Sequence, residues 1–342
     1  MKELSLHIND HLCSILIGEK LLHRLAREKD THMICLVDEN VHTLHKEKFS
    51  SLNCILIPEG EKQKSISFLE KVYRELLAKE ADRKSMIIGI GGGLVTDLAG
   101  FVASTYMRGL RFGFISTTLL GQVDASIGGK NGVNLDGYKN MIGLINQPEF
   151  VWCDLDLLRT LPPEELASGF AEVIKYGAIR DRILFEKLEE GSEEILLLEM
   201  ALLEEIIATS ASIKISIVEA DVNEMGERKL LNFGHTLGHA IERLSGMMHG
   251  EAIAIGMVLA SKLSVKLGFL RNEEAKRLES LIEKAGLPVS TDIPMSAIYD
   301  SLLKDKKRAG TKIHFILLKE LGEAFIHSLE LSELKAALDD LH

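Results

Sequence analysis

The stretch MIIGIGGGLVTDLAG, residues 86–100, runs from an apolar, strand-like segment through three consecutive glycines into a helical segment. Glycines at such a turn let backbone N–H groups approach a phosphate at the helix N-terminus. Asp97 lies in the first turns of the expected helix. The spacing does not satisfy the G-x-G-x-x-G fingerprint, and the best candidate for a ribose-binding carboxylate, Asp38, precedes the glycines. The turn predicts a nucleotide site, with an ordinary tight turn as the alternative.

Around this turn, short apolar runs alternate with helical stretches up to about residue 153. The strand-like runs are SILIG, MICLV, CILIP, MIIGIG and FGFIS, at residues 14–18, 33–37, 54–58, 86–91 and 112–116. Residues 67–79 carry apolar side chains at helical spacing. Strands that alternate with helices predict βαβ units and a largely parallel sheet, whose strand ends usually bind ligands. We expect an α/β nucleotide-binding domain over residues 1–155.

Beyond residue 155 the pattern becomes helical. The run PPEE at residues 162–165 predicts a helix start, because proline tolerates the first turn and acidic side chains suit the positive end of the helix dipole. Helical period continues to about residue 304, with expected stops at Gly191, Gly246, Gly268 and Gly286. KIHFILLKELGEAFIHSLE, residues 312–330, alternates apolar and polar side chains and predicts a hairpin. A mainly helical second domain is expected over residues 156–342.

The composition is that of a large acidic chain. Its 342 residues are 46% hydrophobic, enough for one large domain or two, and its net charge is −11 with a pI near 5.6. Binding to nucleic acid or to an anionic membrane surface is therefore not expected. The four cysteines lack CxxC spacing, which favours buried reduced thiols. MKELSLHIND has no apolar signal core and no apolar run is long enough to span a membrane, so we expect a cytoplasmic protein.

Two polar stretches of the first domain are candidates for ligand binding. EGEKQKS follows a strand, and its Glu61 or Lys64 could address a sugar hydroxyl or a phosphate, with a solvated charged loop as the alternative. Residues 116–143 are rich in Thr, Asn, Asp, Gly and Lys, without helical or strand period. Long irregular segments inside a compact domain are usually functional. Lys130 and Lys139, set among glycines and asparagines, suit binding of an anionic small molecule.

The helical half carries histidine and glutamate at metal-ligand spacing. His235 and His239 are four residues apart and share one face of a helix. Catalytic zinc sites typically use three nitrogen or oxygen ligands from the protein. Glu172, three residues before Lys175 among apolar neighbours, is either buried and in need of a cation or half of a surface ion pair. The candidate donors that remain open are Glu172, His235, His239, Glu242, His249 and Glu251.

Cations accompany these motifs. Arg228 precedes His235 by seven residues, and DKK at residues 305–307 adds further positive charge. A surface location is the simplest explanation for each cation taken alone. Because they recur beside Gly, Asn and His motifs in a chain of net charge −11, they favour an anionic substrate.

Taken together, these stretches resemble 3-dehydroquinate synthase, the lyase family of the shikimate pathway that leads to chorismate and the aromatic amino acids. The resemblance extends, in order, over EGEKQKS, GGGLVTDLAGF, TTLLGQVDASIGGKNGVN, KNMIG, AEVIKYG, LLNFGHTLGHAIE, HGEAIAIGM and DKK. It implies a Rossmann-like N-terminal nucleotide-binding domain and a mostly α-helical C-terminal metal-binding domain. It also implies a homodimer that uses NAD and a divalent metal ion, usually zinc, with cobalt as the alternative.

The resemblance also implies roles for individual positions. The metal ligands it implies are Glu172, His235 and His249. The implied NAD contacts are Asp38, Glu61, Lys64, Gly92, Gly93, Asp97, Thr117, Thr118, Lys139 and Thr160. The implied substrate-binding and catalytic residues are Asp124, Lys130, Asn140, Lys175, Lys214, Glu224, Arg228, Asn232, His239 and Lys306 or Lys307 of DKK. Arg108 matches an arginine that reaches the phosphate of the substrate in the neighbouring subunit.

The implied substrate is 3-deoxy-D-arabino-heptulosonate 7-phosphate, and the implied products are 3-dehydroquinate and phosphate. The C5 hydroxyl is oxidised transiently with NAD, phosphate is eliminated, the ketone is reduced again, and the ring-opened product closes by an intramolecular aldol reaction. Within the implied site, Arg228 and Lys214 suit the carboxylate. The residues implied to bind the phosphate are Lys130, Asn140, His239 and the DKK lysines. Lys175 and Glu224 suit orientation and proton transfer.

Three positions depart from the family pattern. Ser116 stands where a proline is common, Gly121 where alanine is usual and Asn131 where threonine is usual. None of the three removes a charged or metal-ligating group. Three alternatives remain from the sequence: another sugar-phosphate cyclase such as 2-deoxy-scyllo-inosose synthase, a polyol dehydrogenase of the glycerol dehydrogenase type, and a non-catalytic nucleotide-binding module.

Overall fold

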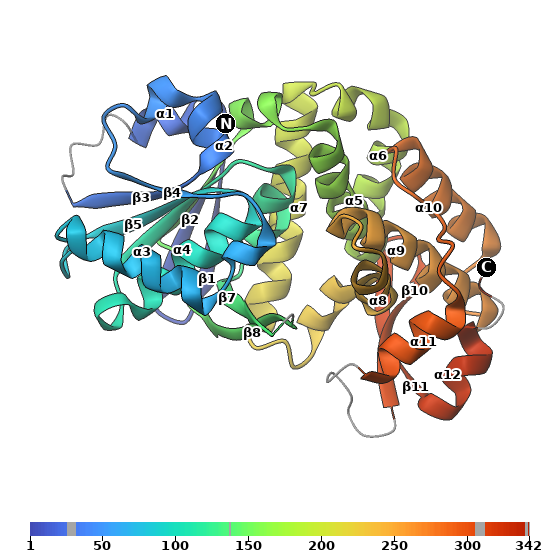
Figure 1. Ribbon diagram of the computed structural model, residues 1–342. Helices are drawn as coiled ribbons and strands as arrows, with labels where there is room; N and C mark the ends of the chain where they lie inside the picture. The colour runs from blue at the N-terminus through green and yellow to red at the C-terminus, as the bar shows by residue number, and fades with distance from the viewer. Residues whose placement is uncertain (26–31, 137, 305–311, 339–340, 342) are drawn as a thin grey trace. The chain divides into compact units, whose positions relative to one another are not determined.

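The computed structural model describes residues 1–25, 32–136, 138–304, 312–338 and 341. The chain forms two compact units, coloured from blue to red along the chain in Figure 1. The first unit comprises Met1–Leu166 and Met200–Glu219, and the second comprises Ala167–Glu199 and Ala220–His342. The expected domain division at residue 155 stays a prediction. The compact units differ from it, because residues 200–219 pack with the N-terminal part of the chain.

A seven-stranded sheet forms the centre of the first unit. Its strands lie in the order β1 (Lys2–Ile8), β2 (His11–Gly18), β9 (Phe150–Asp154), β6 (Arg111–Ser116), β5 (Met86–Gly91), β3 (Met33–Asp38) and β4 (Cys54–Ile57). Only β1 and β2 pair in antiparallel fashion among these neighbours. The five expected strands are confirmed. Sequence reasoning missed β1, although Leu4, Leu6 and Ile8 alternate with polar side chains, and it missed β9, whose five residues run directly into a helical turn.

Helices α1 (Leu21–Leu25), α2 (Glu39–Leu44), α3 (Ile66–Ala78) and α4 (Gly93–Thr105) lie between successive strands of this sheet. The first unit also contains α7 (Met200–Ala220) and the short turns η1 (Lys46–Phe49), η2 (Glu61–Gln63), η3 (Tyr106–Arg108) and η5 (Leu155–Thr160). The hydroxyl of Ser65 caps α3 by accepting the N–H of Phe68. The expected helices at residues 67–79 and after the three glycines are therefore both confirmed. In Figure 1, α3 and α4 lie on the same side of the sheet.

The direction in which successive strands are added to the sheet changes between β3 and β5. From β3 the chain moves outward to the edge strand β4, and then it returns past β3 to β5 and β6. Ligands of open α/β sheets bind outside the carboxyl ends of the strands at such a reversal. The ends of β3 and β5, Asp38 and Gly91, flank this point.

Residues 116–143 are largely regular, so the expectation of an irregular segment is wrong. They hold a π-helical turn, η4 (Gly121–Ala125), and most of an antiparallel hairpin, β7 (Lys130–Leu135) with β8 (Tyr138–Ile145). Glycines hid the strand period, because Gly132 and Gly143 face each other across the hairpin. A Cβ atom on Gly143 would lie 2.7 Å from the carbonyl oxygen of Asn131, so the two strands need a glycine there. The buried amide of Asn131 donates to two main-chain carbonyl oxygens, at 2.8 and 2.9 Å.

The described part of the second unit is mainly helical, as expected. Its helices are α5 (Pro163–Arg180), α6 (Arg182–Leu196), α8 (His235–Ser245), α9 (His249–Lys266), α10 (Asn272–Lys284), α11 (Met295–Lys304) and α12 (Leu331–Leu338), with the turn η6 (Glu227–Asn232). The expected hairpin is confirmed as β10 (Lys312–Glu320) with β11 (Glu323–Glu330). The expected stop at Gly191 is wrong, because α6 continues through it with a kink. Helices α8, α9 and α10 do end just before Gly246, Gly268 and Gly286.

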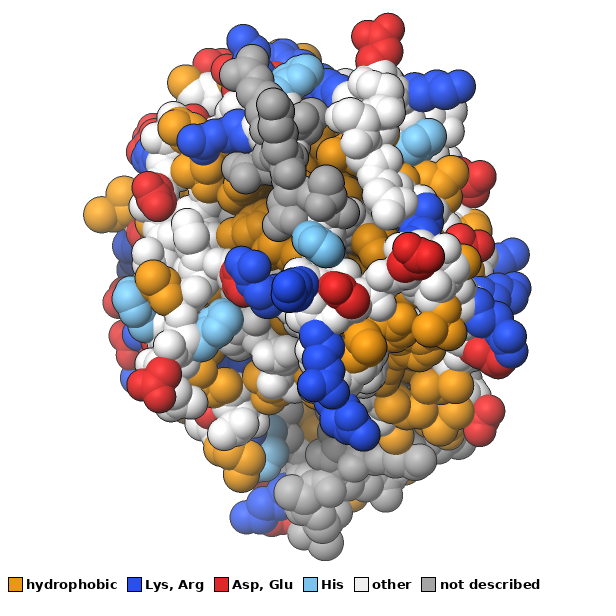
Figure 2. All heavy atoms as spheres, turned by 90° about the vertical axis from the view of Figure 1, so that its left-hand side faces the viewer, with side chains coloured by type: hydrophobic (Ala, Val, Ile, Leu, Met, Phe, Trp, Pro, Cys, Tyr) orange, Lys and Arg blue, Asp and Glu red, His pale blue; other side chains and the backbone are white. Residues whose placement is uncertain are grey.

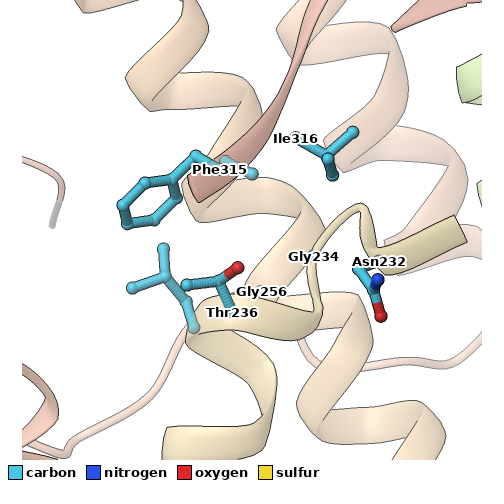
Figure 3. A pocket seen from close by; sticks show the side chains of 8 residues that line it. Asn232, Gly234, Thr236, Gly256, Phe315 and Ile316 are labelled. Atoms are coloured by element: carbon cyan, nitrogen blue, oxygen red, sulfur yellow. The ribbon is translucent and has the colours of Figure 1, made fainter. Parts of the chain in front are cut away.

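Helices α8 and α9 approach so closely that only glycine fits at their contact. A Cβ atom on Gly256 of α9 would lie 2.1 Å from the carbonyl oxygen of Gly234, the residue that precedes α8. At its N-terminus, α9 contacts α5, where a Cβ atom on Gly250 would lie 2.3 Å from the carbonyl oxygen of Ser168. Figure 3 shows a shallow pocket beside this contact, with Gly234, Gly256 and side chains of β10 around it. The contacts fix where the first residues of α8 and α9 lie.

Ser116 and Gly121, two positions where the sequence is expected to depart from the family pattern, fit each other. A Cβ atom on Gly121 would lie 2.2 Å from Oγ of Ser116, and the backbone of Gly121 is not left-handed. We expect Gly121→Ala to destabilise the first unit by about 1–3 kcal/mol through overpacking. Ser116→Ala removes the clashing atom, so the double variant should recover the loss, and a double-mutant cycle by urea unfolding should give a coupling above about 1 kcal/mol. Additive effects would contradict this steric pairing.

Candidate active site

The residues expected to contact NAD lie, with one exception, at one edge of the sheet. They follow consecutive strands: Glu61 and Lys64 after β4, Asp38 at the end of β3, Gly92, Gly93 and Asp97 after β5, Thr117 and Thr118 after β6, and Thr160 after β9. Lys139 is the exception, on β8. The carboxyl ends of parallel strands meet at the same edge, which is where this class of fold binds its ligands.

Asp38 at the end of β3 caps helix α2. Its Oδ1 accepts the N–H groups of Asn40 and Val41 at 2.9 and 3.1 Å. Burial raises the pKa of this carboxyl, while the two N–H groups act in the opposite direction. A Cβ atom on Gly91 would lie 3.2 Å from Cβ of Asp38, so the carboxyl neighbours the glycine-rich turn. An acid that precedes the glycines can therefore lie beside them, because β3 and β5 are adjacent strands.

Lys64 and Asp97 form an ion pair with little solvent exposure. Burial raises the pKa of Asp97 to about 6, and the ammonium group of Lys64 limits that rise. The negative charge of Glu61 raises it further. Oε1 of Glu61 in turn accepts a hydrogen bond of 2.8 Å from the amide of Asn134 on β7. Three residues expected to contact NAD are thus electrostatically coupled.

Lys214 and Asp124, both expected at the substrate, also meet in the first unit. The buried ammonium of Lys214, on α7, lies 2.8 Å from Oδ1 of Asp124 and donates to its main-chain oxygen as well. Lys130 begins β7 and its side chain is exposed. Lys306 and Lys307 of DKK lie outside the described residues. The ion pair between Lys214 and Asp124 links α7 to η4, although these two elements lie far apart in the sequence.

The backbone is strained at two further candidates. Arg108 and the preceding Met107 have φ angles of 71° and 50°, and Asn140 has a φ angle of 53°. Such left-handed conformations cost about 1–3 kcal/mol each for residues other than glycine, and they cluster at functional sites. The N–H group of Asn140 donates to Oδ1 of Asn134 at 2.9 Å, which helps to hold its conformation.

In the second unit, Glu172, His235 and His249 converge. Glu172 lies on α5, and the two histidines are the first residues of α8 and α9. One donor atom from each residue lies within 4.8 Å of the others, and Nε2 of His235 and of His249 lies 3.6 and 3.8 Å from Oε1 of Glu172. Neighbouring donors of a tetrahedral zinc site lie about 3.4 Å apart, since zinc–ligand distances are about 2.0–2.2 Å. The donor set and its spacing therefore fit a divalent metal ion.

The charges around this group are buried. Glu172 has no exposed surface, and Lys175 forms an ion pair with its other carboxylate oxygen, so the alternative of a surface pair is wrong. Burial lowers the pKa of His235 to about 4, which the charge of Glu172 only partly opposes. Burial also lowers the pKa of His249, but the carboxylates of Glu172 and Glu242 outweigh it and raise that pKa to about 9. Negative charge is therefore concentrated around His249.

The other donors left open by the sequence have different surroundings. Oε2 of Glu251 accepts the N–H group of Met248 at 3.0 Å and caps α9, which gives this side chain a structural role. His239 and Glu242 form a second group of close donors with His249. The ring centroids of His235 and His239 are 5.1 Å apart, as expected for neighbours on one helix face. His249 is shared by both groups.

Asp221 organises the loop that carries the remaining candidates. Its carboxylate accepts hydrogen bonds of 3.0, 2.6 and 3.1 Å from the N–H groups of Met225, Gly226 and Arg228. The buried side chain of Arg228 donates to a carbonyl oxygen of this loop. The amide of Asn232 donates to Oε1 of Glu224 at 2.6 Å. Sequence reasoning missed Asp221, although an aspartate shortly before a glycine is typical of a turn capped by a side chain.

Two family models match the chain. The 3-dehydroquinate synthase N-terminal model matches residues 54–168, and the 3-dehydroquinate synthase C-terminal model matches residues 169–308. A 3-dehydroquinate synthase from Dictyoglomus thermophilum is 41% identical over 99% of this chain and 98% of its own length. The chain belongs to the 3-dehydroquinate synthase family. The resemblance, the fold class and the enzymatic activity expected from the sequence are thereby confirmed.

Solved structures of other cyclases share the fold. A 2-deoxy-scyllo-inosose synthase complexed with carbaglucose-6-phosphate, NAD+ and Co2+ is 25% identical, with a TM-score of 0.87 over 99% of this chain and 100% of that chain. A 2-epi-5-epi-valiolone synthase from Streptomyces hygroscopicus with NAD+ and Zn2+ bound is also 25% identical, with a TM-score of 0.87 over 100% and 98%. Both identities lie well below that of the Dictyoglomus 3-dehydroquinate synthase.

The surface of this family member is not uniformly acidic. Figure 2 shows a face on which Lys and Arg side chains gather next to hydrophobic ones, although the net charge of the chain is −11.

No described helix has both the length and the apolarity needed to cross a membrane.

Asp97 provides a test of the cofactor edge through pH. Its folded-state pKa of about 6 exceeds the ordinary 3.8, so ionisation destabilises the fold as pH rises between these values, by up to about 3 kcal/mol above pH 6. In NAD-free protein, Asp97→Asn should raise the melting temperature at pH 8 by about 5–10 °C, and the difference should vanish near pH 4.

Asp82→Asn is the matched control for this experiment. The N–H group of Lys84 lowers the pKa of Asp82. The ionised Asp82 therefore stabilises the fold above its unfolded-state pKa, and this stabilisation is lost as pH falls. This variant should melt lower than the wild type at pH 8. An Asp97→Asn protein that also melts lower at pH 8 would contradict the assigned cost of burying this carboxylate.

Proposed function

We propose that this 3-dehydroquinate synthase converts 3-deoxy-D-arabino-heptulosonate 7-phosphate with NAD at the carboxyl edge of the sheet and a divalent ion at Glu172, His235 and His249. The observation that carries the proposal is the Glu172 group: a fully buried carboxylate faces the Nε2 atoms of two histidines at 3.6 and 3.8 Å. Lys175 pairs with Oε2 of this carboxylate, so the oxygen that faces the two histidines, Oε1, is the one proposed to bind the ion.

Two cofactors supply chemistry that side chains lack. When bound, NAD accepts a hydride from the substrate and returns it, and the metal ion polarises the reacting oxygen as a Lewis acid. The structures of two related cyclases with NAD+ and Co2+ or Zn2+ support the same pair of cofactors here. We assign NAD to the sheet-edge residues and Lys139 named above. We expect zinc or cobalt at Glu172, His235 and His249, which are called the metal group below.

In the first unit, the proposed substrate contacts are cationic or amide side chains. Lys214 receives the carboxylate, and Lys130 and Asn140 receive the phosphate, for which Lys306 and Lys307 are further candidates. Asp124 neutralises Lys214 and holds its ammonium in place. We further propose a homodimer in which Arg108, on its strained turn, reaches the phosphate of the neighbouring subunit.

In the second unit, the proposed contacts surround the metal group. Arg228, held by Asp221 at its N–H group, grips the substrate carboxylate. His239 donates to the phosphate. Lys175 and Glu224 orient the substrate hydroxyls and move protons, since each is already placed by a partner, Glu172 or Asn232.

The activity test uses the protein with the heptulosonate phosphate, NAD and Zn2+. We expect inorganic phosphate and 3-dehydroquinate in equal amounts, without net NADH, because the hydride returns to the same molecule. Phosphate is measured colorimetrically and NADH by absorbance. Absence of phosphate release would contradict the function, and NADH accumulating in step with substrate consumption would indicate a dehydrogenase instead.

The two histidines of α8 give a second test. His235→Ala should abolish tight metal binding, because it removes a ligand, whereas His239→Ala should keep the full metal content and lower kcat/KM by about 10–100-fold, the effect of losing a charged hydrogen bond. Metal content is measured after gel filtration by atomic emission. Loss of the metal in His239→Ala would show that the ligand set is wrong.

A further inference from the structure

His249 presents its two ring nitrogens to two different carboxylates. Nε2 lies 3.8 Å from Oε1 of Glu172, on the side of the metal group. Nδ1 lies 3.4 Å from Oε2 of Glu242, on α8. An imidazole that binds a metal ion through Nε2 carries its proton on Nδ1, and that N–H group needs an acceptor.

His235 has the same arrangement with a different acceptor. Its Nε2 lies 3.6 Å from Oε1 of Glu172, and its Nδ1 lies 3.0 Å from the carbonyl oxygen of Phe233. Both histidines therefore turn Nε2 toward the metal group and Nδ1 toward an outer acceptor. One acceptor is a neutral backbone carbonyl, and the other is a carboxylate.

The position of His249 explains why it needs the stronger acceptor. Its side chain is 30% exposed, against 12% for His235, and it begins α9 directly after the short connection from α8. A partly exposed ring at a helix start has more rotational freedom than a packed one. Glu242 lies in the last turn of α8, only 13% exposed, where it can hold the ring in one orientation.

We propose that Glu242 is a positioning residue of the metal centre, which fixes the Nδ1–H tautomer and the ring orientation of His249 and makes Nε2 a stronger ligand. This inference rests on the proposed ligand set of Glu172, His235 and His249. Carboxylate partners of this kind typically contribute 10–100-fold to metal affinity. Glu242 keeps this role without touching the metal ion or the substrate.

The alternative is that Glu242 is itself a ligand. His239, Glu242 and His249 bring donor atoms within 4.8 Å of one another, so a second ion there would use the other nitrogen of His249. Such an ion would displace the proton from Nδ1 while Nε2 is already bound, which is unfavourable for an imidazole near neutral pH. The two roles differ in the number of ions that bind per chain.

The experiment measures zinc affinity of full-length protein by competition with a chromophoric chelator after metal removal. Glu242→Gln keeps the size of the side chain and weakens the acceptor, so we expect affinity 10–100-fold below that of the wild type. Glu251→Gln is the matched control, because this glutamate only caps α9, and its affinity should stay within about twofold. Both metal-free variants should keep the far-ultraviolet circular dichroism spectrum and the gel-filtration volume of the wild type, which excludes misfolding as the cause.

Three further measurements separate the outcomes. His235→Ala must lose tight binding; if it does not, the proposed ligand set itself fails. If His235→Ala loses binding while Glu242→Gln keeps wild-type affinity, the ligand set stands and the role of Glu242 is refuted. Co2+-loaded Glu242→Gln should show an altered visible spectrum, because the His249 ring is reoriented. Two tightly bound ions per wild-type chain would make Glu242 a ligand and overturn the inference.

Discussion

The metal group of this protein depends on how closely three helices approach one another. Where α8 meets α9, and where α9 meets α5, the backbones touch through Gly234, Gly256 and Gly250 without side chains between them. Each contact lies within a few residues of a proposed ligand: Ser168 precedes Glu172 by one helical turn, and Gly234 and Gly250 adjoin His235 and His249. Close backbone contact leaves the helices little freedom to slide, so it keeps the three donor side chains near one another.

In each of the two units, buried lysines among the proposed contacts form neutral pairs with carboxylates. Lys64 pairs with Asp97, Lys175 with Glu172 and Lys214 with Asp124, and all three lysines are almost fully buried. Such pairing limits the desolvation cost that buried charges carry. For Lys175 and Lys214, which we propose as substrate contacts, it also means that the ammonium groups are already oriented, which favours specificity more than raw affinity.

Much of the fold was predictable from the sequence, because strand and helix periods dominate both halves. The hairpin at residues 130–145 was not, since Gly132 and Gly143 interrupt its alternation. In the site, four-residue spacing could not distinguish His235 from His239, and no local pattern shows that Nδ1 of His235 faces a backbone carbonyl. Sequence order was also misleading for Asp38, whose place beside the glycines follows only from the pairing of β3 with β5. Such contacts depend on tertiary structure.

The contact between Ser116 and Gly121 makes these two positions interdependent. A side chain at 121 and the hydroxyl at 116 compete for the same space. Alanine at 121 therefore fits only where the hydroxyl at 116 is absent or displaced. Anyone who redesigns this part of the chain has to choose the two residues as a pair.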